Sequence, residues 1–167
     1  MSRKTNKNGE APNKGELLEL LRKMILIRAF EEQMRSLYSA GAIPGLLHLC
    51  AGQEAVAVGV CSELEQTDWI ASNHRGHGHC LAKGARSDLL AAELMGKRSG
   101  YGKGRGGTLH VFDMTNHNMG TNGIVGGGIP LAAGAALNFK RRGEKGLAVC
   151  FFGDGALNQG LAFEVMN

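Results

Sequence analysis

The stretch that decides the fold lies near the end of the sequence and reads Leu147-Ala148-Val149-Cys150-Phe151-Phe152-Gly153-Asp154-Gly155. Its first six residues are apolar, and an apolar run of this length predicts a buried strand of a parallel sheet. Two glycines then bracket an acid, and the apolar segment from Leu161 begins like a helix. In open α/β sheets ligands bind beyond the carboxyl ends of the strands, so the turn around Asp154 is the predicted site.

The acid in this turn decides between two kinds of ligand. Glycines let a ligand approach the backbone closely, and the start of a helix favours anions, which together indicate a phosphate. A carboxylate would repel a bare phosphate, but a divalent cation between the two removes the repulsion. Mg²⁺ in proteins takes one or two carboxylates together with phosphate oxygens. Asp154 therefore indicates a magnesium–diphosphate site, and an ordinary strand-to-helix turn with a capping aspartate remains the alternative.

Composition indicates one globular domain in a reducing compartment. The chain has 167 residues, of which 43% are apolar, and this is enough for a single core. The net charge of +4 comes largely from a basic first segment, so it gives little support for a nucleic-acid partner. Four scattered cysteines without a C-x-x-C pair favour free thiols and a cytoplasmic protein. No apolar run is long enough to cross a membrane, and the first residues lack a signal-peptide core.

The first part of the chain is expected to be a tail followed by a long helix. Residues 1–14 are polar and basic, which is typical of a disordered tail, and residues 15–167 are expected to form a single domain. Apolar residues at helical spacing predict a helix from Gly15 to about Ala40, with Gly41 as its stop. The apolar face of this helix comprises Leu17, Leu20, Leu21, Met24, Ile27 and Phe30.

Shorter elements are expected between that helix and the final strand. Residues 41–51 read as an apolar loop, and a lone histidine among leucines, His48, is by this pattern alone more often a packing residue. The other expected elements are a helix over 52–64, a strand over 68–72, a helix over 87–95 with Ser87 as its N-cap, and a helix over 129–141.

A histidine cluster follows the strand expected over 68–72 and reads Asn73-His74-Arg75-Gly76-His77-Gly78-His79. Imidazoles bind Zn²⁺, but glycine spacing on a turn would point these side chains in different directions, and Arg75 would repel a cation. We therefore interpret Arg75 as an anion clamp that presents its planar guanidinium to phosphate. The histidines are expected to line the same pocket as proton donors near neutral pH.

Two glycine-rich stretches are candidate ligand loops. Residues 96–110 are basic and lack the G-K-[ST] of a P-loop, and they are too short and too closely flanked by folded segments for an RNA-binding RGG tract. A loop packed near an anionic ligand remains the favoured interpretation. Residues 120–130 are uncharged, and their backbone could hold a flat heterocycle, with Ile124 and Val125 as apolar contacts. A tight turn into the next helix is the alternative for this second stretch.

Together these motifs resemble a known family, the alpha subunit of the thiamine-diphosphate-dependent first component of 2-oxo acid and acetoin dehydrogenase complexes. The resemblance covers nearly everything after about residue 20. It rests on the Phe30-Glu31-Glu32 region, His48-Leu49, Gly52-Gln53-Glu54-Ala55, the histidine cluster from His74 to His79, Gly102-Lys103-Gly104-Arg105-Gly106-Gly107, Gly123-Ile124-Val125 and Gly153-Asp154-Gly155-Ala156.

The resemblance implies an α/β thiamine-diphosphate-binding fold, a parallel sheet flanked by helices, with the cofactor between this subunit and a beta subunit. A beta-subunit glutamate would activate the cofactor, which then acts as the electron sink for cleaving a carbon–carbon bond. The fragment would pass to lipoamide on an acyltransferase component. The implied site residues are Asp154 for Mg²⁺, Gly155 and Ala156 at the diphosphate, Arg75 at its phosphates, Gly123 and Val125 at the aminopyrimidine, and His48 and His74 as catalytic residues on the substrate side.

The resemblance also bears on substrate and on completeness. Pyruvate enzymes of this family usually have tyrosine where His74 stands, so acetoin is favoured as substrate and pyruvate is the alternative. The family motif continues past Asn167 to a further asparagine, so an amino-terminal fragment of about half a subunit is expected, with the sheet incomplete at its carboxyl end. Such a fragment is expected to be inactive alone and only marginally folded.

Two interpretations from other classes compete with this one, and the second of them fails. A non-catalytic interaction fragment would use the long first helix and the glycine-rich faces to dock a partner. A nicotinamide dinucleotide enzyme could be read from Gly153 and Gly155, but Asp154 lies between them, and the chain is too short to hold the acidic residue expected about 20 positions later.

Overall fold

The computed structural model describes residues 12–167. Of the tail predicted over 1–14, residues 1–11 lie outside this part, and Lys14 already belongs to the first helix, α1 (Lys14–Ser39). The side chain of Asn13 accepts hydrogen bonds from the amides of Gly15 and Glu16, and Glu16 accepts one from the Asn13 amide. This capping box starts the helix one residue earlier than predicted.

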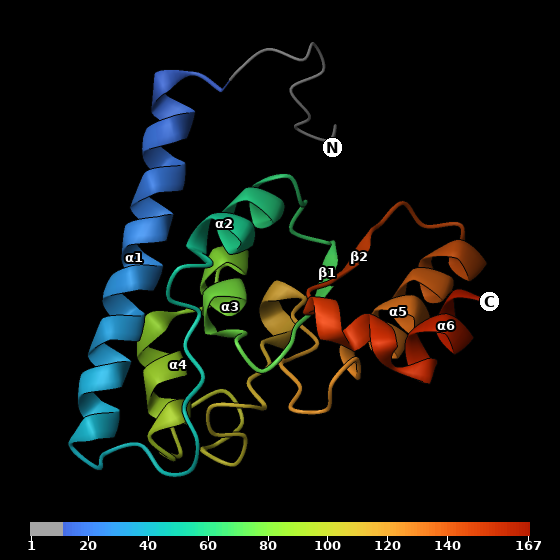
Figure 1. Ribbon diagram of the computed structural model, residues 1–167. Helices are drawn as coiled ribbons and strands as arrows, with labels where there is room; N and C mark the ends of the chain where they lie inside the picture. Colours follow the sequence, from blue (N-terminus) through green and yellow to red (C-terminus); the bar gives the residue numbers. More distant parts are fainter. Residues whose placement is uncertain (1–11) are drawn as a thin grey trace.

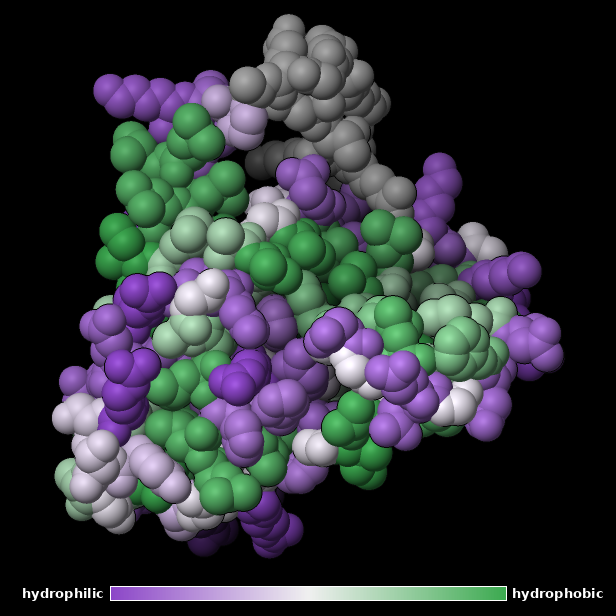
Figure 2. Space-filling model, in the orientation of Figure 1, coloured by the Kyte–Doolittle hydropathy of each residue, from purple (hydrophilic) through white to green (hydrophobic). Residues whose placement is uncertain are grey.

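Helix α1 ends where the sequence predicts, but only its second half is buried. Gly41 adopts φ +75°, a left-handed conformation that glycine takes without strain, just after the helix. Near the other end Leu17 and Leu21 are 52% and 49% exposed. Figure 2 shows hydrophobic surface over these first turns. No helix of the described chain is both long and apolar enough to cross a bilayer.

Three shorter helices share one hydrophobic core with the second half of α1: α2 (Glu54–Ser62), α3 (His77–Lys83) and α4 (Ser87–Leu94). The sequence does not predict α3, because Gly76 and Gly78 resemble turn residues. A Cβ atom at Gly76 would collide with Thr121, and one at Gly78 would collide with Cys50, so these glycines permit close packing instead. The predicted N-cap of α4 is also wrong: Ser87 is its first helical residue and Arg86 its N-cap, without a side-chain bond.

The sheet is parallel, as predicted, but small. Strands β1 (Trp69–Ala71) and β2 (Ala148–Cys150) pair in parallel with Ile70 opposite Val149. Helix α5 (Gly128–Arg142) crosses from one to the other and packs on both. Figure 1 shows the strands between the α1–α4 group and the pair of α5 with α6 (Gly160–Met166). The mixed arrangement of helices and a parallel sheet confirms the α/β class at this coarse level.

Strand β2 is less buried than a six-residue apolar run predicts. Its three residues are half-buried, and the flanking Leu147 and Phe152 are 42% and 41% exposed. The reason is that β2 pairs only with β1 within residues 12–167, so its other edge is uncovered there. The best-buried apolar side chains lie on the other side, around Ile27, Leu90 and Val111.

Candidate functional site

A cavity of about 220 Å³ lies at the carboxyl ends of β1 and β2. Its wall comes from the segment after β1, from the glycine-dense stretch before and into α5, and from the segment after β2. Its position beyond the ends of parallel strands is where an α/β sheet places a ligand. Of the predicted site residues, the wall includes His74, Val125, Asp154, Gly155 and Ala156.

Asp154 heads the short 3₁₀ helix η2 (Asp154–Asn158), after an extended Gly153. Its side chain is exposed and has no hydrogen-bond or ion-pair partner among residues 12–167. Nor does that part of the chain bring three or more His, Cys, Asp or Glu residues together around a possible metal ion. These donors do not fit a metal cage made of protein alone. They fit Mg²⁺, which binds through one or two carboxylates when phosphate oxygens complete its shell.

The two predicted catalytic histidines lie together. The rings of His48 and His74 are edge-to-face with their centres 5.0 Å apart. Burial, and then the neighbouring His48 and Arg75, lower the pKa of His74, so its ring is neutral near pH 7. His74 is on the cavity wall, and His48 lies next to it, with a buried Nδ1 atom that has no hydrogen-bond partner within the described chain. A buried unpaired nitrogen is uncommon and is available to another group.

Arg75 and Gly123 lie near the cavity but not on its wall. The Nη1 atom of Arg75 donates to the carbonyl of Leu49 at 2.7 Å, and its backbone amide donates to Asn73. A guanidinium carries five N–H donors, so others remain for a phosphate. Gly123 is exposed two residues before Val125, in a turn where the Ile124 amide donates to Asn122.

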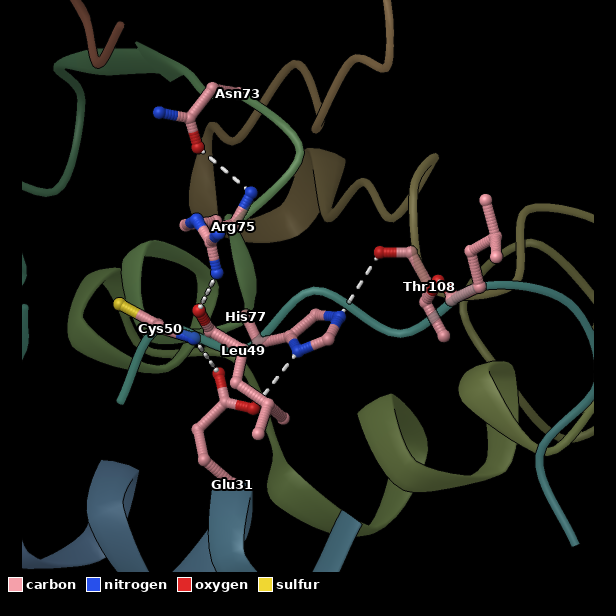
Figure 3. A network of polar contacts seen from close by, with 8 residues as sticks. Glu31, Leu49, Cys50, Asn73, Arg75, His77 and Thr108 are labelled. Atoms are coloured by element: carbon pink, nitrogen blue, oxygen red, sulfur yellow. Dashed lines mark hydrogen bonds and ion pairs between the residues drawn. The ribbon is translucent and has the colours of Figure 1, made fainter. Parts of the chain in front are cut away.

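The other two histidines of the cluster do not line the cavity, which corrects the sequence-based expectation. His77 is fully buried: its Nδ1 atom lies 3.2 Å from Glu31 Oε2, and its Nε2 atom lies 3.0 Å from the Thr108 carbonyl. His79 stacks on Phe151 at 3.9 Å, and burial, then His77, lower its pKa to about 4. Figure 3 shows His77 between Glu31 and Thr108. Both rings are inside the protein because the stretch continues into helix α3.

The basic glycine-rich loop of 96–110 surrounds the carboxylate of Glu93, which belongs to the chain itself and not to an anionic ligand. The amides of Gly102, Gly104 and Gly106 donate to the carboxylate of Glu93 at 2.7, 2.8 and 2.7 Å. Glu93 is fully buried in α4. Sequence reasoning missed both Glu93 and Glu31. For Glu93 the available signal was a single acid between apolar residues on a predicted helix, whereas Glu31 is followed by Glu32 and Gln33 and gave no such signal.

A second, larger groove of about 670 Å³ lies between the start of α1 and the end of α2. Lys83 is among its lining residues and donates to the carbonyls of Glu65 and Gln66. None of the predicted site residues reaches this groove. The smaller cavity at the strand ends is therefore the candidate site.

Comparison with known proteins matches the chain to a family model described as dehydrogenase E1 component, over residues 22–167. The alpha subunit of acetoin:2,6-dichlorophenolindophenol oxidoreductase from Bacillus subtilis is 51% identical over 150 residues, which cover 90% of this chain and 45% of that protein. The subunit of the same name from Cupriavidus necator is 47% identical over 93% of this chain and 46% of its own length. The pyruvate dehydrogenase E1 component subunit alpha of Zymomonas mobilis is 45% identical over 91% of this chain and 43% of its own. The chain thus spans about half the length of these relatives.

Proposed function

The chain belongs to the dehydrogenase E1 component family, and we propose that it is the cofactor-binding part of an alpha subunit that uses thiamine diphosphate and Mg²⁺ to cleave acetoin. One observation carries the proposal: His74, Val125 and Asp154, which come from three separate segments, meet in one cavity at the ends of the parallel strands. The family resemblance implies a contact with the cofactor or its metal for Val125 and Asp154, and a place on the substrate side for His74. We infer that the two strands belong to a thiamine-diphosphate-binding fold.

Each residue has a role that suits its surroundings. The exposed carboxylate of Asp154 would hold Mg²⁺, while Gly155 and Ala156, which line the cavity, would border the diphosphate. Arg75 would offer its remaining N–H donors to the phosphates. The backbone at Gly123 and Val125 would hold the aminopyrimidine. When bound, thiamine diphosphate supplies an electron sink for carbon–carbon cleavage.

The substrate side would be formed by His48 and His74. The lowered pKa of His74 keeps its ring neutral at pH 7, so one ring nitrogen can accept a proton while the other donates. The edge-to-face contact with His48 holds the orientation of both rings. The role of these groups would be to orient the substrate oxygens and to hold a proton beside them.

The dimensions of the cavity support a partner subunit. Ligand pockets usually have about 300–1,000 Å³, whereas this one has about 220 Å³ and opens at its edge. We therefore propose that a beta subunit closes the site and that a lipoyl-bearing acyltransferase component accepts the fragment. The relatives carry the name subunit alpha, which implies at least one further subunit in those proteins.

Acetoin is favoured over pyruvate as the substrate. Relatives named for acetoin are 51% and 47% identical, against 45% for the pyruvate relative from Zymomonas mobilis. The presence of histidine at position 74 supports the same choice. All four cysteines are free thiols, which supports the proposal of a reducing, cytoplasmic location.

The test is a chimera in which residues 1–167 replace the matching segment of the Bacillus subtilis relative, assembled with that protein's partner subunit. We expect acetoin-dependent reduction of 2,6-dichlorophenolindophenol that requires thiamine diphosphate and is abolished by EDTA. Calorimetry should show cofactor binding that depends on Mg²⁺, and no binding of NAD.

The parent complex serves as the positive control. An active parent with a folded chimera that turns over neither acetoin nor pyruvate would refute the catalytic proposal and favour an interaction fragment. A higher kcat/KM for pyruvate than for acetoin would reverse the choice of substrate.

A further inference from the structure

The short segment 46–50, which carries His48, is held on both sides by side chains from other elements. The Leu49 carbonyl accepts from Arg75 Nη1 at 2.7 Å, and the Cys50 amide donates to Glu31 Oε1 at 2.9 Å. At the other end the Leu46 carbonyl accepts from the hydroxyl of Thr108. Figure 3 shows the contacts from Glu31 and Arg75 converging on Leu49 and Cys50. The backbone around His48 is therefore fixed by contacts from three separate parts of the chain.

Glu31 does not act alone, because its second oxygen meets His77. Both side chains are fully buried, with Oε2 and Nδ1 3.2 Å apart. The Nε2 atom of His77 faces the Thr108 carbonyl at 3.0 Å, and a carbonyl only accepts, so Nε2 carries a hydrogen. The contact between Nδ1 and Oε2 also needs one hydrogen, whichever atom holds it. The pair therefore shares one proton and is neutral overall, as a dry interior requires.

The same pair connects the two contacts that hold the segment. Glu31 binds the Cys50 amide directly, and His77 binds the backbone of Thr108, whose hydroxyl binds Leu46. Burial, and next the charge of Glu31, raise the pKa of the Cys50 thiol to about 11, so the thiol stays protonated beside the pair. His48 lies between these two attachment points, with its ring edge-on to His74.

We propose that Glu31 and His77 are a positioning pair that sets His48 against His74 for the reaction. The inference rests on the proposed function, which places His48 beside the substrate. Glu31 is not on the cavity wall, and it acts by fixing the Cys50 amide. Losing this bond removes one of the two side-chain contacts at this end of the segment and leaves the contact from Arg75, so the ring of His48 then moves relative to His74.

The test compares four variants of the chimera described above. Glu31→Leu removes both bonds. Glu31→Gln keeps an oxygen for the Cys50 amide and can donate to Nδ1 of a neutral His77, so it serves as the conservative rescue. Asp68→Leu is the matched control, since Asp68 is also buried and also accepts two backbone amides, from Glu65 and Leu147. Glu32→Leu removes an exposed charge from the neighbouring position.

Two readouts are expected to separate positioning from stability. In Glu31→Leu, hydrogen exchange over residues 46–50 should rise at least about tenfold relative to α4, because the buried Cys50 amide loses its acceptor. The kcat for acetoin should fall by about 100-fold, the effect of a displacement of about 1 Å, while thiamine diphosphate binding stays within about threefold. Glu31→Gln should restore most of the kcat and most of the protection from exchange over residues 46–50. Asp68→Leu should lower the unfolding midpoint without changing exchange over residues 46–50.

Equal loss of kcat in Glu31→Leu and Asp68→Leu, or unchanged exchange over residues 46–50 in Glu31→Leu, would overturn the positioning pair. If the unmutated chimera shows no turnover, the proposed function fails, and the exchange readout still decides whether Glu31 holds the segment. If Glu31→Leu does not fold, Glu31→Gln becomes decisive: its charge is lost while both bonds remain, so a 100-fold loss of kcat in this folded variant would refute positioning by hydrogen bonding.

Discussion

The two segments that carry the candidate site are built in opposite ways. The segment 46–50 around His48 is held by the buried side chains of Glu31 in α1 and Thr108, and by the half-buried Arg75 in the turn after β1. The segment 153–159 around Asp154 is largely exposed, and its hydrogen bonds are short-range backbone turns. This chain therefore fixes the segment proposed to face the substrate by itself, whereas the segment proposed to bind the metal has no such support within residues 12–167.

Helix α3 connects the two segments. Phe151, three residues before Asp154, stacks on His79 of helix α3, and His79 is hydrogen-bonded to Ser72 at 2.6 Å. Helix α3 also contains His77 of the buried pair. This short helix is thus connected to both segments. Substitutions can therefore be chosen that act near segment 46–50, on helix α3 or on segment 153–159.

The largest effect is expected from Glu93→Leu, which acts on the loop 96–110 that carries Thr108, one of the residues that hold segment 46–50. Three glycine amides would lose their acceptor, and each unsatisfied group costs about 1–3 kcal/mol, so the free energy of unfolding should fall by about 4 kcal/mol. Urea unfolding measures this, with Glu93→Gln expected to lose about half as much because its oxygen still accepts. Glu32→Leu is the control, and an equal loss there would show that the amide contacts are not responsible.

The next largest effect is expected at His79 of helix α3, whose contribution to stability depends on pH. The pKa of His79 is lowered from 6.5 to about 4, mainly by burial. Between these values the unfolded chain takes up a proton that the folded chain refuses, so stability is full above pH 6.5 and falls as the pH drops to 4. The total loss is about 3 kcal/mol.

Unfolding in urea at several pH values checks this prediction. His79→Asn should be less stable than the wild type at pH 7 and should lose this pH dependence. His110→Asn, at an exposed histidine, should keep it. If the wild type and His79→Asn respond to acid in parallel, His79 is not the titrating group.

In the exposed segment 153–159, Asp154→Asn should lower the affinity for the cofactor without changing the free energy of unfolding. The carboxylate has no partner within the described chain, so the free energy of unfolding should shift by less than about 0.5 kcal/mol. Affinity for thiamine diphosphate with Mg²⁺ should fall about 100-fold, or about 2.8 kcal/mol, in the assembled chimera. Calorimetry and urea unfolding measure the two quantities. If Asp154→Asn lowers the free energy of unfolding as much as it weakens cofactor binding, Asp154 also supports the fold and the two segments do not differ as described.

The smallest effect is expected at Glu54, which begins helix α2 four residues after segment 46–50. A hydrogen bond from Arg28 at 2.6 Å and the amide of Gly52 lower the pKa of Glu54 to about 2. The stabilisation is present above the ordinary value of 4.5 and is lost as the pH falls through about 2. It should be smaller than that of His79, since Arg28 is 48% exposed.

The measurement is the difference in acid unfolding between the wild type and Glu54→Gln. This difference should shrink from pH 4.5 to 2, and Arg28→Gln should reproduce the behaviour of Glu54→Gln. A difference that stays constant over this range would mean that Glu54 contributes no pH-dependent stability.

Much of the fold and part of the site follow from local patterns. Local sequence patterns predict α1 and α5, and the apolar run before Gly153 predicts a parallel strand that leads into the turn at Asp154. The position of Asp154 in the cavity follows from that strand end. Helix α3 could not be predicted, because Gly76 and Gly78 look like turn residues in the sequence. In the structure they leave room for close contacts with Thr121 and Cys50.

The sequence by itself determined the alternation of helices and strands, the Gly153-Asp154-Gly155 turn, and the motifs that indicate the family. Only the tertiary structure decided which charges are buried and what they hold. Glu31 meets a histidine 46 positions away and then fixes the segment that carries His48. The physical reason is that strands and helices follow from short-range periodicity, whereas a buried carboxylate is stable only where distant parts of the chain bring donors to it.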